Sequence, residues 1–430
     1  MNSIRKLLRN NFSKNVFMIA GGTAIAQVLN LFFSPIITRL YTPDEIGILT
    51  IFTSIISILI IASSLRYEIA IPIATKEKQA VNLLVLSFVI LLLYVVMLII
   101  IVGVGNSFLF IFGNTNQITK FRWFIPLGVL FLGCYQILNR WALREKNFKA
   151  ISKTRVSQTV FGELSKITFG ISNFGPIGLI IGKIISHSAG TLTLSKSLLN
   201  RRELFQLVSL KDMKCVWKRY YHFPLYSGPD KLLHTFTMQL PIIFLASIYG
   251  GGVVGFYGLA NNIVKLPMSL IGKSVADVFY SEIASMGKEN PQKIKELTDS
   301  LQKKLILIAL LPLILLLLGG PFLFSLVFGD GWYQAGEYAR LLSILVFFNF
   351  ITTPISNITS VFERVRESFF LVVLRLILVL IVFGIVYLLS LNSYWAVGLY
   401  SVVMSLNYLA IYSFSQWILK KEISKIEEAL

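Results

Sequence analysis

The chain has 430 residues, of which 55% are hydrophobic and only 14% charged, and its mean hydropathy is +0.73. A soluble domain needs a more polar surface, so these values exclude a soluble globular protein and indicate an integral membrane protein. The formal net charge of +19 must be placed relative to a bilayer before a partner is inferred from it, and nucleic acid is not expected as a partner.

Twelve segments are long and apolar enough to cross a bilayer as helices, which predicts an all-α fold. They cover residues 16–38, 46–74, 80–104, 120–142, 153–173, 177–199, 221–248, 252–285, 304–328, 335–361, 368–390 and 394–418. The fifth, seventh and eighth contain several polar residues each. Removing any one of them would put the basic loops that follow on inconsistent sides of the membrane, so we expect about twelve spans.

The basic residues are concentrated in alternate loops. With the N-terminus in the cytoplasm, 29 of the 40 Lys and Arg residues fall on the cytoplasmic side, four fall on the opposite side and seven lie within spans. The positive-inside rule therefore predicts that both termini are cytoplasmic. The outer loops are short, so no external catalytic domain is expected.

A weak internal repeat divides the spans into two sets of six. A shift of 208 positions aligns residues 41–47 (YTPDEIG) with residues 249–255 (YGGGVVG), each at the turn between the first two helices of a half. We predict an N-terminal lobe over 1–200, a cytoplasmic linker over 201–219 and a C-terminal lobe over 220–430. Because six is even, the two bundles are related by a pseudo-two-fold axis along the membrane normal. A cleft between them is expected.

Seven basic residues lie inside the apolar spans, with four acids at similar depth. The bases are Arg66, Lys166, Lys183, Lys231, Lys265, Lys273 and Arg375, and the acids are Glu68, Glu163, Asp230 and Asp277. A charge at membrane depth is costly, so it usually faces a bundle interior or a wet cavity and marks a pathway. The excess of positive charge predicts a cavity that receives an anion.

In the second span, Arg66 and Glu68 are two residues apart, so in a regular helix they would not face each other. A structural alternative is an interhelical pair of Arg66 with an acid such as Asp230. The seventh span opens with Pro and Gly residues at 224, 228 and 229, which predicts a kink beside Asp230 and Lys231.

The fifth span places Glu163 and Lys166 at i, i+3, where they can pair, and the sixth carries Lys183 nearer the outer side. In the eighth span one helical face would carry the polar residues Asn262, Lys265, Ser269, Lys273 and Asp277. Lys273 and Asp277 can pair there, and this polar seam is equally explained by packing against a neighbouring helix.

Arg375, in the eleventh span, is close enough to the inner interface to extend its charge into water. With the locally paired lysines set aside, four cations remain as candidates for binding an anion: Arg66, Lys183, Lys231 and Lys265. Arg66 and Lys265 are the strongest of these, because Lys183 lies toward the outer mouth and Lys231 adjoins Asp230.

No catalytic motif, P-loop or metal-ligand spacing occurs in the chain, so we expect neither an enzyme nor ATP-driven transport, and neither cofactor nor metal. Ionisable groups buried in a membrane often lie on a proton or sodium pathway. The buried acids Glu68, Glu163, Asp230 and Asp277 are the candidates for ion coupling, although each has a structural cation partner nearby.

Four stretches carry a family resemblance: TRLYTPDEIGILTIF, LRYEIAIPIA, FPLYSGPDKLLH, and LPIIFLASIYGGGVVGFYGLANNIVKLPMSLIGKSVADVFYSEIAS. Over nearly the whole chain the sequence resembles bacterial polysaccharide or O-antigen flippases of the multidrug/oligosaccharidyl-lipid/polysaccharide exporter superfamily. The resemblance implies movement of an undecaprenyl-pyrophosphate-linked oligosaccharide from the inner to the outer leaflet of the cytoplasmic membrane, for O-antigen, capsule or a similar polymer. It also implies two lobes that rock around a cationic cavity, with a polysaccharide polymerase and a chain-length regulator as partners.

The sequence has three alternative functional interpretations. A drug or cation exporter of the same superfamily should have mainly acidic cavity residues, whereas the buried bases outnumber the acids here. A membrane glycosyltransferase or polymerase would need a larger loop outside the membrane. A scaffold of the polysaccharide assembly machinery that transports nothing stays open.

Overall fold

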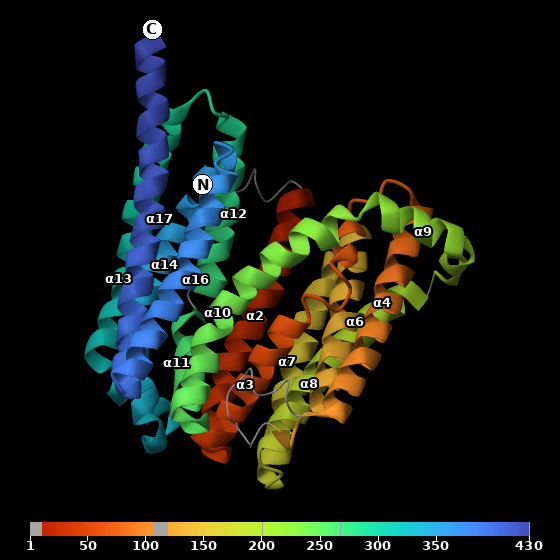
Figure 1. Ribbon diagram of the computed structural model, residues 1–430, viewed down its shortest axis with the longest axis horizontal. Helices are drawn as coiled ribbons and strands as arrows, with labels where there is room; N and C mark the ends of the chain where they lie inside the picture. Colours follow the sequence, from red (N-terminus) through yellow and green to blue (C-terminus); the bar gives the residue numbers. More distant parts are fainter. Residues whose placement is uncertain (1–10, 106–118, 200, 267, 430) are drawn as a thin grey trace. The chain divides into compact units, whose positions relative to one another are not determined.

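The computed structural model describes residues 11–105, 119–199, 201–266 and 268–429, and every regular element in these ranges is a helix (Figure 1). The all-α fold predicted from the sequence is confirmed. The chain forms two compact units that divide between Val254 and Gly255. This division comes after the seventh predicted span, and the lobes predicted over 1–200 and 220–430 stay a prediction.

The first unit contains the first seven predicted spans. Its longer helices are α2 (Asn11–Leu40), α3 (Pro43–Leu59), α4 (Glu77–Val104), α6 (Phe124–Arg144), α7 (Phe148–Ile171), α8 (Pro176–Leu199), α9 (Leu210–Arg219) and α10 (Gly228–Tyr249). Three short segments of tighter or wider helix are η1 (Tyr67–Ala70), η3 (Arg202–Leu207) and η4 (Phe223–Ser227). α7 packs against both α2 and α8, and α10 packs against α3, which explains why the seventh span groups with the first six.

The second unit begins within α11 (Gly251–Val264). Its further elements are η5 (Met268–Gly272), α12 (Lys273–Met286), α13 (Pro291–Phe328), η6 (Asp330–Trp332), α14 (Tyr333–Ile355), α15 (Ile358–Val361), α16 (Val365–Leu388) and α17 (Ser393–Ala429). α14 packs against α13 and α17, and α16 packs against α17.

Each of the twelve predicted spans overlaps at least one helix. Within the described residues, eight helical stretches are long and apolar enough to cross a membrane: Met18–Leu40, Glu77–Val104, Pro176–Lys196, Phe223–Tyr249, Pro291–Phe328, Asp330–Val361, Phe369–Leu388 and Ser393–Lys425. The other four predicted spans correspond to α3, which has 17 residues, to the more polar α6 and α7, and to the interrupted pair α11 and α12. The chain is therefore a multi-pass membrane protein.

The turn before α3 shows how the sequence starts a helix. Thr42 is the N-cap, and Pro43 occupies the first helical position, where its missing N–H costs nothing. The Thr42 backbone N–H donates to Oε2 of Glu45 at 2.8 Å, and the Glu45 N–H donates to Oγ1 of Thr42 at 3.4 Å. This reciprocal capping box fixes the first turn of α3.

The basic segment that follows α8 folds into η3 and α9, as expected for a short surface helix. Asn82 of α4 holds this segment: Nδ2 donates to the Leu207 carbonyl at 3.0 Å, and Oδ1 accepts from the Ser209 N–H at 3.1 Å. Lys78 and Asp212 add an ion pair of 2.9 Å. The segment is thus fastened along α4.

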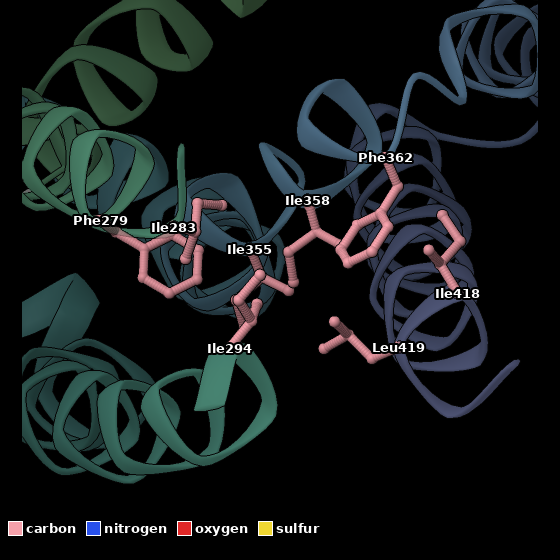
Figure 2. Packing of buried hydrophobic residues seen from close by; sticks show 8 residues of the cluster. All are labelled: Phe279, Ile283, Ile294, Ile355, Ile358, Phe362, Ile418 and Leu419. Atoms are coloured by element: carbon pink, nitrogen blue, oxygen red, sulfur yellow. The ribbon is translucent and has the colours of Figure 1, made fainter. Parts of the chain in front are cut away.

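An apolar cluster joins five elements of the second unit (Figure 2). Its buried members are Phe279, Ile283, Ile294, Ile355, Ile358, Phe362, Ile418 and Leu419. Figure 2 shows side chains from α12, α13, α14, α15 and α17 converging on one another. Each fully buried side chain of this size contributes about 2 kcal/mol relative to an exposed one.

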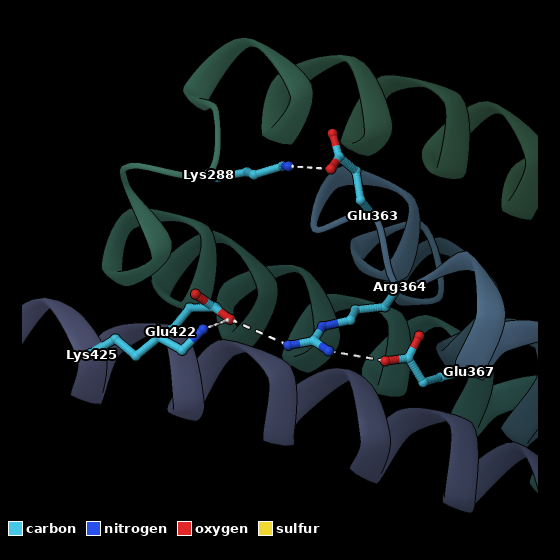
Figure 3. A network of polar contacts seen from close by, with 6 residues as sticks. All are labelled: Lys288, Glu363, Arg364, Glu367, Glu422 and Lys425. Atoms are coloured by element: carbon cyan, nitrogen blue, oxygen red, sulfur yellow. Dashed lines mark hydrogen bonds and ion pairs between the residues drawn. The ribbon is translucent and has the colours of Figure 1, made fainter.

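Near this cluster, ion pairs connect the loop after α12, the turn before α16 and the polar end of α17 (Figure 3). The pairs are Lys288–Glu363 at 2.8 Å, Arg364–Glu367 at 3.0 Å, Arg364–Glu422 at 3.7 Å and Lys425–Glu422 at 2.8 Å. Exposed ion pairs are individually weak, but Arg364 and Glu422 each serve two partners, so the contacts act as a network.

Candidate functional site

The chain between α3 and α4 leaves the helical path within the second predicted span. α3 ends at Leu59 and α4 begins at Glu77, so the continuous helix predicted over 46–74 is wrong. Leu65 and Arg66 have φ values of 48° and 64°, a left-handed conformation that costs a side-chain-bearing residue about 1 kcal/mol or more. Strain of this kind clusters at functional sites.

Arg66 and Glu68 form an ion pair inside this irregular segment. Nη1 of Arg66 lies 3.4 Å from Oε1 of Glu68, and Ser64 Oγ donates to Oε2 of Glu68 at 2.6 Å. The expectation that residues 66 and 68 face apart is wrong, because it assumed a regular helix. The Glu68 side chain is 4% exposed and that of Arg66 is 17% exposed, so the acid is more deeply buried than the base.

The guanidinium of Arg66 has unused capacity. Its Nε is buried and has no hydrogen-bond partner among the residues that the structure describes. Its ion pair with Glu68 is long for a charge-assisted hydrogen bond. A guanidinium presents five N–H donors, so most of the Arg66 donors remain for a ligand.

Contacts with two other elements, α6 and α9, hold the irregular segment. Arg144, at the end of α6, donates from Nη1 to the carbonyl oxygens of both Ile71 and Ala74. The Tyr67 hydroxyl donates to the Trp217 carbonyl at 3.2 Å, and the two rings lie 5.5 Å apart. The carbonyl groups of Ile71, Ala74 and Trp217 are thereby satisfied by protein donors.

The start of the seventh span approaches Arg66. The predicted kink takes the form of the π-helical segment η4, which runs directly into α10. A Cβ added to Gly228 would lie 3.9 Å from Cγ of Arg66, and the charge of Asp230 acts on Arg66. Asp230 and Lys231 are exposed, and among the described residues Arg66 forms its ion pair with Glu68 rather than with Asp230. π-helical segments frequently occur at functional sites.

The Glu163–Lys166 pair predicted on one face of α7 is present, with 2.7 Å between Nζ and Oε1. Lys183 of α8 interacts electrostatically with both members of this pair. The helices are in close contact there, since a Cβ on Gly182 would lie 2.5 Å from Cγ of Lys166. Lys183 thus belongs to a group with Glu163 and Lys166.

Two further basic residues lie on helices of the first unit, although the sequence placed them in a cytoplasmic loop. Arg140 lies on α6, and its charge acts on Arg66. Arg155 lies on α7, where Nη1 donates to Oγ1 of Thr23 and its side chain is hydrogen bonded to Tyr135. The polar residues of the fifth span were the sequence signal for Arg155, because they indicate a helix that packs against protein rather than lipid.

In the second unit, the eighth predicted span is not one regular helix. α11 ends at Val264, η5 has the wider π geometry, and α12 begins at Lys273. The change of helical period means that the predicted stripe from Lys265 to Asp277 does not follow a single helix face. The side chains of both Lys265 and Asp277 are exposed, whereas those of Ser269 and Lys273 lie outside the described residues.

The prediction that Arg375 extends toward the interface is wrong. Its side chain is buried in the second unit, with 8% exposure. Nε donates to Oδ1 of Asn407 at 3.1 Å, and the guanidinium carbon lies 4.8 Å from the ring centre of Tyr408. α17 supplies both partners, so the packing of α16 against α17 keeps the Arg375 guanidinium buried.

Within the described residues, no group of three or more His, Cys, Asp or Glu side chains is arranged to hold a metal ion. Of the four cations predicted to bind an anion, Arg66 has a buried donor, Nε, without a hydrogen-bond partner among the described residues.

The family model for polysaccharide biosynthesis proteins matches residues 36–337. A multidrug resistance MATE family transporter of the MOP superfamily, in an inward-facing conformation, has a similar structure, with a TM-score of 0.74 and 14% identity over 93% of this chain and 99% of that one. The lipid II flippase MurJ, inward closed, gives a TM-score of 0.72 and 13% identity over 93% and 87% of the two chains. A MOP superfamily transporter from Pyrococcus furiosus, described as having a binding pocket of reverse polarity, gives a TM-score of 0.63. It has 15% identity over 97% of this chain and 98% of that one. No curated protein sequence matches.

Proposed function

Because the chain belongs to the polysaccharide biosynthesis protein family, we propose that it is a flippase for a lipid-linked oligosaccharide. The cargo is an undecaprenyl-pyrophosphate-linked glycan repeat unit, moved from the inner to the outer leaflet of the bacterial cytoplasmic membrane by alternating access. The product serves O-antigen, capsule or exopolysaccharide synthesis, and a polysaccharide polymerase and a chain-length regulator act with the flippase. Both termini are cytoplasmic in this proposal.

The free donors of Arg66 are the observation that carries the proposal. Pyrophosphate is a compact anion whose passage through hydrocarbon without a partner would be prohibitive. Arg66 is held on an irregular backbone by Arg144 and Tyr67, its Nε has no partner among the described residues, and its one ion pair is long. A guanidinium in this state can bind phosphate oxygens through two donors at once.

The other three proposed cations differ in their exposure and in the charges around them. Lys231 is exposed at the start of α10, and Lys265 is exposed where α11 ends. Lys183 lies in the electrostatic field of Glu163 and Lys166. We therefore assign the pyrophosphate first to Arg66, and we propose Lys265, Lys231 and Lys183 as further contacts.

An ion gradient is proposed to drive the cycle through one or more of four acids. Glu68 and Glu163 already accept contacts from Arg66 and Lys166, so protonation of either acid would release a cation. Asp230 and Asp277 are exposed, so an ion can reach them directly. Flipping measured in vesicles with separately imposed proton and sodium gradients tests this, and insensitivity to both gradients would refute it.

A drug or cation exporter is the second candidate, supported by the fold shared with a multidrug transporter. A cation cargo needs unpaired carboxylates, and of the four predicted acids Glu68 and Glu163 are engaged by bases of this chain, which leaves Asp230 and Asp277 for such a cargo. A scaffold that transports nothing is a third candidate. Both are separated from the flippase by the experiment below.

The direct test uses purified protein in vesicles that contain a labelled undecaprenyl-pyrophosphate-linked oligosaccharide. Flipping is measured as the fraction of glycan that becomes accessible to an enzyme added outside. We expect flipping by the native chain and a loss of at least tenfold in Arg66→Ala and Lys265→Ala. Lys303→Ala removes an exposed cation from α13 and serves as the matched control, with flipping unchanged.

Transport of labelled cationic drugs in the same vesicles, without glycan flipping, would replace the proposal with the exporter. Absence of both activities from a folded native chain would favour the scaffold. If flipping occurs and both cation variants retain it, the flippase stands and its cationic site is wrong.

A further inference from the structure

The burial of Arg375 poses an electrostatic problem that the proposed flippase cycle does not solve. Its side chain is 8% exposed on α16, inside the second unit. Among the described residues it donates one hydrogen bond to the neutral Asn407 and has a cation–π contact with Tyr408. Neither partner carries a negative charge.

No acid of the chain neutralises this arginine. All 21 Asp and Glu residues have side chains within the part of the chain that the structure describes, and Arg375 forms an ion pair with none of them. An uncompensated charge in an apolar interior is strongly unfavourable unless it is paired and hydrogen bonded. Within the described residues no carboxylate supplies the counter-charge, so a bound anion can supply it.

A second polar group beside Arg375 is also left without a partner. Asn407 is 2% exposed, its Oδ1 accepts from Arg375, and its Nδ2 has no hydrogen-bond partner among the described residues. A buried donor without an acceptor costs about 1–3 kcal/mol. Asn407 thus presents a buried donor without an acceptor beside the buried charge of Arg375.

Tyrosines complete the surroundings. Tyr400 is buried, is hydrogen bonded through its side chain to Tyr257, and interacts electrostatically with both Arg375 and Tyr408. A tyrosine hydroxyl can donate as well as accept. α11, α16 and α17 therefore bring donors, aromatic faces and one fixed positive charge into the same region.

We propose that Arg375, Asn407 and Tyr400 form a buried binding site for a monovalent inorganic anion of the size of chloride. One negative charge balances the single guanidinium, whereas a divalent phosphate would leave net negative charge in an apolar interior. The anion would accept from Arg375 and from the free Nδ2 of Asn407, which satisfies both groups. The site is distinct from Arg66, since it lies within the second unit alone.

The test measures thermal unfolding of the purified full-length chain in nanodiscs as sodium gluconate is replaced by sodium chloride at constant ionic strength. An anion that binds only the folded state raises the Tm progressively with its concentration above Kd. We expect chloride and bromide to raise the Tm by several degrees. The shift should disappear in Arg375→Gln and shrink in Asn407→Leu.

Arg364→Gln is the matched control, because Arg364 precedes the same helix but already has Glu367 and Glu422 as partners. Its chloride-dependent shift should equal that of the native chain. An absent shift in the native chain, a shift retained in Arg375→Gln, or a larger effect of phosphate than of chloride would overturn the site.

If Arg375→Gln does not fold, bromide in crystals of the native chain decides the matter. An anomalous peak within hydrogen-bond distance of Arg375 and Nδ2 of Asn407 supports the site, and its absence overturns it. Flipping need not be measured, so the result is independent of the proposed transport activity.

Discussion

Gly47 and Gly251 are in backbone contact although 204 positions separate them in the chain. A Cβ added to Gly47 would overlap the carbonyl oxygen of Gly251. Close by, a Cβ on Gly252 would lie 3.3 Å from the Asp44 carboxylate. The start of α3 and the turn between α10 and α11, which the weak internal repeat relates to each other, therefore touch through glycine.

Gly47→Ala should destabilise the protein by about 2 kcal/mol, because the added methyl group forces backbone to move in a packed contact. The Tm of the purified chain measures the effect. Gly21→Ala is the control, since a Cβ at that position has nothing within 4 Å, and it should leave the Tm unchanged. Equal Tm values for the two variants would contradict the close approach.

Arg144→Met should reduce both stability and flipping, although Arg144 is not assigned to the pyrophosphate. The change removes the donor shared by the carbonyl groups of Ile71 and Ala74, and each unsatisfied buried carbonyl costs about 1–3 kcal/mol. Arg144→Lys should restore part of the flipping, because an ammonium group can still donate. A positioning role is ruled out if Arg144→Met flips at the native rate.

Tyr67→Phe should loosen α9 while leaving the aromatic packing intact. The variant loses the hydrogen bond to the Trp217 carbonyl, worth about 1 kcal/mol, and keeps the ring contact. Amide hydrogen exchange in α9 should become about fivefold faster. Exchange in α16, which belongs to the other unit, is the internal reference and should not change.

Acid should release the same surface helix through Asp212. The hydrogen bond from Lys78 is the largest cause that lowers the pKa of Asp212 below its ordinary value of 3.8. A lowered pKa in the folded state stabilises the protein above the ordinary pKa, and this contribution is lost as the pH falls through the folded-state value. The Tm difference between the native chain and Asp212→Asn should be largest above pH 5 and vanish in stronger acid.

Glu363 provides an independent comparison, since its pKa is lowered by Lys288 in the second unit. Glu363→Asn should show the same dependence on pH without faster exchange in α9. A Tm difference for Asp212→Asn that stays constant down to strong acid would show that the Lys78 contact contributes nothing.

Hydropathy located the eight helical stretches that are long and apolar enough to cross a membrane, because long apolar runs have few alternatives in a bilayer. It missed the break after Leu59, where Leu65 and Arg66 adopt left-handed backbone without a glycine to signal it. The Arg66–Glu68 pair depends on that break, so helical periodicity could not predict it. Arg375 was misplaced for another reason: its burial depends on Asn407 and Tyr408, more than 30 positions later in the chain.

The length of α17 has a mechanical consequence. With 37 residues the helix is about 55 Å long, well beyond the roughly 30 Å of hydrocarbon that it crosses. Its polar end carries Glu422 and Lys425, which the ion-pair network joins to Arg364 (Figure 3). A stiff rod moves as one body, so a small change of tilt within the membrane becomes a larger displacement at this end. A distance probe attached beyond Lys425, in the aqueous phase, would therefore detect this displacement.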